Sequence, residues 1–226
     1  MKRKKRKNII IKKDFDWIFF LIYDKLRRKD QKTFYYIDKT QRKQYEKIGG
    51  KKMSETMEKI LTRRSIRKYK PDAVPQEILD QIIKAGTYAA TGMGAQSPII
   101  IAVTNKELRD RLSKMNAEIM GVSGTDPFYG APVVLIVLAD KTRPTYLYDG
   151  SLVMGNLMLA AHDLGIGSCW IHRAKEEFEL PEGKEILKSL GIEGNYEGIG
   201  HCILGYADGP EPEAKPRKES YVYYAK

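Results

Sequence analysis

Helical spacing of apolar residues is the first pattern that the chain shows after residue 53. One predicted helix begins after Ser54 and ends at Arg63-Arg64, with its apolar side chains on a single face. Pro75 suits the first position of the next predicted helix, because proline is favoured there. The same spacing predicts further helices over 106–120, from Tyr146 to Leu164 and, as a shorter segment, over 183–190.

Short apolar runs between these helices predict strands. IIIAV at 99–103 and VVLIVLA at 133–139 are continuous and rich in β-branched residues, which is typical of strands buried on both faces. Two further strands are predicted at 167–171 (GSCWI) and 198–206 (GIGHCILGY). The sequence therefore predicts an α+β or mixed α/β fold around a buried sheet.

The C-terminal segment is Pro-rich and then becomes β-prone. It reads DGPEPEAKPRK and continues with ESYVYY at 219–224, for which the sequence offers no neighbouring strand. A terminal strand without a local partner often docks onto another subunit. We expect this segment to do so.

Charge divides the chain near residue 52. The whole chain holds 40 Lys+Arg and 29 Asp+Glu, a net charge of +11. Residues 1–52 hold 19 basic and 6 acidic residues (+13), which leaves 21 and 23 (−2) for residues 53–226. The basic character thus belongs to the first segment, and the body is a mildly acidic domain with no expected nucleic-acid or membrane partner.

Residues 1–52 are interpreted as an extension outside the native fold. Their one apolar run, at 17–23, is shorter than the ~20 residues that span a bilayer, and no cleavage site follows it. The run Ile48-Gly49-Gly50-Lys51-Lys52, back-translated, resembles a purine-rich ribosome-binding site and spacer before Met53. We expect Met53 to be the natural start, while a signal peptide, a membrane-surface anchor and a nucleic-acid arm remain alternatives from charge alone.

Cysteine usage indicates a reducing, cytoplasmic setting. Cys169 and Cys202 each lie in an apolar run, and such thiols are usually buried and reduced. Together with His172 and His201 they follow no zinc spacing, so no metal site is expected.

Three segments could bind an anion or a flat ring. Arg63-Arg64-Ser65-Ile66-Arg67 places three guanidiniums and a hydroxyl within five residues, which suits a phosphate. The small residues of 89–98 allow close approach of the backbone to a ligand, and Lys215-Pro216-Arg217 holds two more cations on a rigid tail. The alternatives are a solvated basic turn, a plain helix-to-strand connection and a charged tail. A Rossmann site is weakly supported, because no full GxGxxG motif is present.

Taken in order, these segments resemble the nitroreductase family. The resemblance covers nearly all of residues 56–226, through RRSIRKYKPDAVP, AATGMGAQSP, FYGAPVVLIVLAD, NLMLAAHDLGIGSCWI and ILGYADGPEPEAKPRK. It implies a central, mostly antiparallel sheet flanked by helices, in a homodimer that exchanges its C-terminal strands. It also implies two FMN sites at the subunit interface and NADH or NADPH as co-substrate.

The resemblance assigns cofactor-binding residues by position. Those expected around the FMN phosphate are Arg63, Arg64, Ser65, Lys215 and Arg217, with Arg67 near the pyrimidine edge of the ring. Those expected to approach the ring from the other subunit are Ala90, Thr91, Gly92 and Gln96. Those expected to line the ring near its reactive nitrogen are Ile171, His172 and Arg173.

The resemblance implies a two-step cycle in which NAD(P)H reduces bound FMN and an acceptor reoxidises it. Nitroaromatics, quinones and activated enones are the usual acceptors of the family. No side chain is required as an acid or base, and His172 and Tyr129 are only speculative candidates. If His172 and Arg173 face the cavity, the acceptor is anionic or hydrogen-bonding. A flavin-binding module without turnover, or a binder acting through the basic N-terminus, remains the alternative function.

Overall fold

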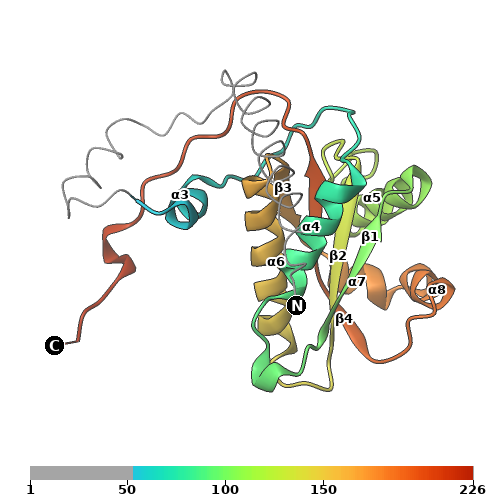
Figure 1. The fold of residues 1–226 in the computed structure, drawn as a ribbon. Coiled ribbons are helices and arrows are strands. Elements are labelled where there is room, and N and C mark those ends of the chain that lie inside the picture. The colour runs from blue at the N-terminus through green and yellow to red at the C-terminus, as the bar shows by residue number, and fades with distance from the viewer. Residues whose placement is uncertain (1–52, 226) are drawn as a thin grey trace, which may run out of the picture. The chain divides into compact units, whose positions relative to one another are not determined.

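The structure, a computed structural model, describes residues 53–225. From Ser54 onward these residues form one unit, shown in Figure 1. Its elements in chain order are α3 (Glu55–Thr62), α4 (Gln76–Thr87), η1 (Gly92–Gly94), β1 (Pro98–Val103), α5 (Lys106–Met120), β2 (Val133–Asp140), α6 (Tyr146–Asp163), β3 (Gly167–Ile171), α7 (Ala174–Glu179), α8 (Pro181–Ser189), β4 (Tyr196–Gly205) and η2 (Glu219–Tyr221).

The four strands form one sheet in the order β1-β2-β4-β3, and every neighbouring pair is antiparallel. The predicted α+β class with a mostly antiparallel sheet is therefore confirmed. All four strands lie where the apolar runs predicted them. Beyond β3, Ser65 forms a single parallel bridge with Ser168, so the segment after α3 extends the edge of the sheet.

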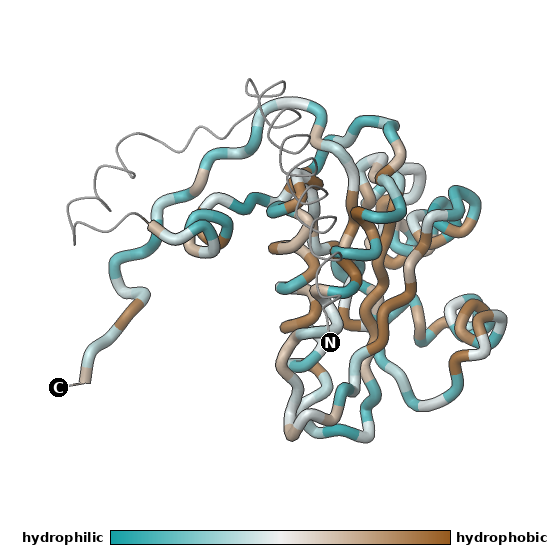
Figure 2. The backbone as a smooth tube through the Cα atoms, viewed as in Figure 1, coloured by the Kyte–Doolittle hydropathy of each residue, from teal (hydrophilic) through white to brown (hydrophobic). Residues whose placement is uncertain are grey.

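Strand β2 explains the continuous apolar run at its position. Val134, Ile136 and Leu138 pack into one core cluster, and the alternate residues pack into a second cluster on the other face. Helices α4 and α6 contribute to the second cluster, while α5, α7 and α8 contribute to the first. Figure 2 shows the resulting hydrophobic band through the central strands.

Some predicted boundaries shift. Pro75 is the residue before α4 rather than its first residue, and α7 was not predicted. At the C-terminus the β-prone segment contains the short 3₁₀ turn η2 and extended residues. The described part of this segment, up to residue 225, forms no strand. Figure 1 shows this segment leaving the body, so its pairing with a second subunit stays a prediction.

The two thiols are buried and free, as predicted. Burial raises the pKa of Cys202. Across residues 53–225, no group of three or more metal-binding side chains is placed to hold an ion, and no described helix is long and apolar enough to cross a membrane. The apolar run at 17–23 and the rest of residues 1–52 lie outside the described residues.

Candidate functional site

The arginine segment runs along the edge of the sheet beside β3. Helix α3 ends at Thr62, and the backbone N–H of Arg63 caps it by donating to the Lys59 carbonyl at 3.1 Å. The chain then extends, and the Ile66 N–H donates to the Ser168 carbonyl at 2.9 Å. The Ile66 side chain is buried in the core. This anchor fixes the positions of the arginines on either side of it.

Arg63 offers a buried donor without an acceptor. Its Nη1 atom is buried and has no hydrogen-bond partner among the described residues. Leaving a buried donor unpaired costs about 1–3 kcal/mol, and more when it is charged. Such a group is ready to bind an anion.

The positive charge of the arginine segment affects the pKa of the Cys169 thiol. Burial raises its pKa, while the nearby guanidiniums of Arg67 and Arg63 and a hydrogen bond with the Ser65 side chain lower it. The side chain of Arg67 is exposed, with Nη1 3.5 Å from the Ser65 carbonyl. Arg63, Ser65 and Arg67 therefore lie near the start of β3, and their binding of a phosphate stays a prediction.

Arg64 and the C-terminal tail approach each other. Arg64 Nη1 donates to the carbonyls of Leu61 and Arg63 at 2.9 and 2.8 Å. Burial lowers the pKa of Arg64, and the charges of Arg217 and Arg63 lower it further, against the opposing effect of Glu211. The structure thus brings Arg217 close to the arginine segment. Lys215 is exposed on the same tail.

The predicted ring-lining segment follows the other end of β3. Ile171 lies three positions after Ser168, or about 10 Å along the strand. His172 is exposed, whereas Arg173 is half-buried and its Nη1 lies 3.4 Å from Asn116 Oδ1. Arg173 is therefore turned toward α5 and partly covered, whereas the His172 side chain is exposed.

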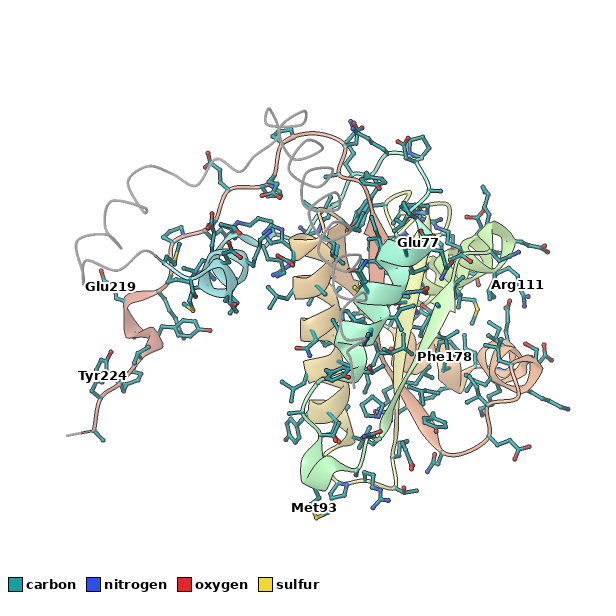
Figure 3. All side chains as sticks on the ribbon, viewed as in Figure 1. Glu77, Met93, Arg111, Phe178, Glu219 and Tyr224 are labelled. Carbon is teal, nitrogen blue, oxygen red and sulfur yellow. The ribbon has the colours of Figure 1, made fainter. Side chains whose placement is uncertain are left out.

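The small-residue loop is rigidly built. The Gly92 N–H donates to Asp149 Oδ1 at 3.0 Å, and the Gln96 N–H donates to Thr91 Oγ1 at 3.1 Å. Met93 and Gln96 both adopt left-handed backbone conformations. The Met93 side chain is 93% exposed and is labelled at the tip of the loop in Figure 3. Ala90, Thr91, Gly92 and Gln96 therefore form a fixed projection from the body.

One chain does not bring this loop to the arginine segment. The loop is fastened to Asp149 near the start of α6, whereas Lys59 of α3 pairs with Asp163 at the end of α6, at 3.1 Å. Asp163 lies fourteen positions after Asp149, which corresponds to about 20 Å of helix at 1.5 Å per residue. Within one chain, the loop and the arginine segment therefore lie toward opposite ends of α6.

Asp149 organises the loop, and we predict that its replacement loosens it. The buried carboxylate also accepts from Ser97 Oγ at 2.8 Å and from Thr145 Oγ1 at 3.1 Å. Asp149→Asn puts an amide NH₂ against these donors, so we expect a loss of about 1–3 kcal/mol of stability, or roughly 2–4 °C in Tm per kcal/mol. Asp72→Asn, at an exposed position, is the control for thermal melting. Equal melting of both variants would contradict this role.

Several organising residues were missed by the sequence reasoning. They are Asp149 in α6, Asn116 in α5, Glu177 in α7 and His201 in β4, all buried. Lone polar residues inside apolar runs, such as His201 in GIGHCILG, were the available signal. The speculative candidate Tyr129 lies near the buried Tyr69, whose pKa is raised mainly by burial and slightly by Tyr129.

Fold and site together define an α+β protein with a cationic edge and a projecting loop. The family model for the "Nitroreductase family" matches residues 60–206, so the chain belongs to the nitroreductase family. A crystal structure of a nitroreductase with bound FMN from Bacteroides fragilis superposes with a TM-score of 0.70 at 31% identity, over 77% of this chain and all of that one.

Sequence relatives agree with the family. A relative from Methanothermobacter thermautotrophicus, whose name pairs NADH dehydrogenase with NAD(P)H nitroreductase, is 34% identical over 128 residues. This match covers 54% of the chain and 64% of that relative's length. An NADPH-flavin oxidoreductase from Vibrio harveyi is 28% identical over 180 residues, which are 75% of this chain and 72% of that one.

Proposed function

We propose that the chain is an FMN-dependent oxidoreductase that takes hydride from NADH or NADPH and passes it to an oxidised acceptor. The observation that supports this most directly is the buried, unpaired Nη1 of Arg63 beside Ser65 and Arg67. A guanidinium in that state fits a phosphate, and FMN-bound or FMN-using relatives fit the same reading.

Two groups of residues would contact FMN, one at its phosphate and one at its ring. Arg63, Arg64 and Ser65 would hold the phosphate with Lys215 and Arg217 of the tail. Arg67 would lie near the pyrimidine edge, where a positive charge favours the reduced ring. When bound, FMN supplies the two-electron chemistry between nicotinamide and acceptor. The protein binds, orients and tunes it.

A homodimer completes the proposed site. The outer face of α6 exposes Leu147, Tyr148 and Leu152, and α3 exposes Met57 and Ile60. Exposed large apolar side chains on these two helices indicate surface that another protein covers. A second copy would bury them and would bring its loop at Ala90–Gln96 to the ring. The extended tail would then pack on the partner.

His172 is the residue of this chain that bears on acceptor choice. Its side chain is exposed at the end of β3, while Arg173 is turned toward Asn116. An imidazole beside the ring would favour acceptors with a hydrogen-bonding or anionic group, among the nitroaromatics, quinones and activated enones that we propose.

Steady-state kinetics test the proposed function. The rate of NADH or NADPH oxidation is measured against a quinone or a nitroaromatic at several fixed concentrations of the other substrate. If the nicotinamide and the acceptor bind to one site in turn, double-reciprocal plots of the rate at different fixed concentrations of the second substrate are parallel. A protein that binds FMN but supports no turnover with any of these acceptors would be a flavin-binding module, and the proposal would be wrong.

The native chain is proposed to begin at Met53. Residues from Ser54 onward form a unit by themselves, and the charge pattern changes at the same point. A protein that starts at Met53 is expected to melt at the same temperature and to bind FMN as the full chain does. N-terminal sequencing of protein from its native cell decides the start, and recovery of a chain beginning at Met1 would overturn it.

A further inference from the structure

Arg173 holds a backbone conformation that a side chain disfavours. Its φ and ψ are 77° and 8°, in the left-handed region that glycine adopts most easily. A residue with a Cβ stays there only when its surroundings hold it. The contacts around Arg173 must therefore supply that stabilisation.

Asn116 contacts both residues of this turn. It projects from α5 and is fully buried, and its Nδ2 donates to the His172 carbonyl at 2.8 Å. Its Oδ1 lies 3.4 Å from Arg173 Nη1. One amide thus holds the main chain before Arg173 and the side chain of Arg173 itself.

Glu177 fixes the orientation of that amide. Asn116 Nδ2 also donates to Glu177 Oε1 on α7. If the amide were reversed, Asn116 Oδ1 would face the Glu177 carboxylate and the His172 carbonyl. All three oxygens are acceptors, so no hydrogen bond could form between them. The carboxylate therefore selects the one orientation that supports the turn.

His201 accompanies the buried carboxylate from the central strand β4. Its Nε2 lies 3.1 Å from Glu177 Oε2, and both side chains are fully buried. The two atoms are close but do not meet hydrogen-bond geometry, and His201 also lies against the Phe128 ring, with centroids 5.2 Å apart. In the sheet, His201 is the register partner of Ile171. The contacts from Asn116 through Glu177 to His201 therefore connect His172 with Ile171, its neighbour at the end of β3.

We infer that Asn116, Glu177 and His201 are positioning residues that hold the His172–Arg173 main chain in the conformation that lines the flavin ring. The inference rests on the proposed function, because the ring is the ligand that the turn would contact. These residues do not touch the ring. They act through the carbonyl of His172 and the side chain of Arg173.

Asn116→Ala tests the inference through FMN affinity. The apoprotein is titrated with FMN by fluorescence, and the visible spectrum of the complex is recorded. We expect roughly ten- to a hundredfold weaker binding, since a displaced turn would lose one or two hydrogen bonds to the ligand, and a changed flavin band. Glu177→Leu is expected to act in the same way. Glu177→Gln keeps an acceptor for Asn116 and is expected to bind FMN nearly as the wild type does.

A matched pair at Arg173 separates positioning from general destabilisation. Arg173→Gly and Arg173→Ala both remove the guanidinium, but only glycine adopts the left-handed conformation without strain. In the Asn116→Ala background, Arg173→Gly is expected to restore most of the affinity and the spectrum, and Arg173→Ala is not. As single variants at a half-buried site, Arg173→Gly should bind FMN more tightly than Arg173→Ala.

The outcomes separate this inference from the proposed function. Wild-type protein that takes up no FMN contradicts the proposed function itself. Wild-type protein that binds FMN, with Asn116→Ala unchanged in affinity and spectrum, contradicts the positioning network alone. Equal rescue by glycine and alanine also contradicts it. If Asn116→Ala does not fold, the two single Arg173 variants decide, and equal affinity for FMN would overturn the inference.

Discussion

Arg63→Ala is expected to weaken FMN binding by roughly ten- to a hundredfold, because a hydrogen bond to a charged group contributes about 1.5–3 kcal/mol. The apoprotein should respond in the opposite sense. Arg63 Nη1 is buried without a partner among the described residues, so its removal relieves an unfavourable group. The melting temperature of the apoprotein should therefore stay the same or rise while FMN affinity falls.

Arg111→Ala is the control for this first prediction. Arg111 pairs with Glu182 at 2.9 Å and is labelled on α5 in Figure 3, on the face away from α6. The Arg111→Ala substitution also removes one guanidinium, but outside the proposed site, so FMN affinity should not change. Arg63→Lys should retain part of the affinity, because lysine keeps the charge but not the fork of donors. A fall in apoprotein melting with unchanged FMN affinity would assign Arg63 a purely structural role.

Removal of residues 208–226 is expected to produce a monomer that no longer retains FMN through gel filtration. The tail carries Lys215 and Arg217, and its Tyr221, Tyr223 and Tyr224 are 68–84% exposed on the single chain. A run of exposed aromatic side chains of this kind indicates a surface that a partner covers. Without the tail the site loses the cations of Lys215 and Arg217. It also loses the loop that the partner would supply, so FMN affinity should fall by roughly a hundredfold or more.

A charge variant separates the two roles of the tail. Lys215→Ala with Arg217→Ala keeps the aromatic residues and removes only the cations. It should remain dimeric by light scattering while binding FMN more weakly. Truncated protein that is still dimeric and still yellow would contradict the proposed exchange of tails.

The fold was largely predictable where one local pattern determined it. Helix α5 begins and ends where its periodicity predicted, and Asn105 caps it through its side chain. Strand β2 was predicted from its apolar run alone. Helix α7 was missed because it has six residues and buries Glu177, a residue that a hydrophobic pattern scores as exposed. Its helical form depends on neighbours that the local sequence does not specify.

The site was predictable as far as its residues are contiguous. Arg63, Ser65 and Arg67 gather because one extended segment holds them. The small residues at 89–98 predicted a close approach, and a Cβ on Gly92 would lie 2.3 Å from Thr145 Oγ1. That approach is to Thr145, the N-cap residue of α6 in the same chain, so Gly92 serves packing whatever else the loop contacts. Contacts such as Asn116 with His172 join distant segments, and no spacing could have predicted them.

The visible absorption spectrum of the purified protein tests the central claim most directly. The apoprotein is mixed with FMN, freed of excess cofactor and then treated anaerobically with NADH and, separately, with NADPH. The proposed oxidoreductase predicts a retained yellow flavin band that one or both nicotinamides bleach and that a quinone restores. A colourless protein that takes up no FMN, or a flavin band that neither nicotinamide bleaches, would contradict it.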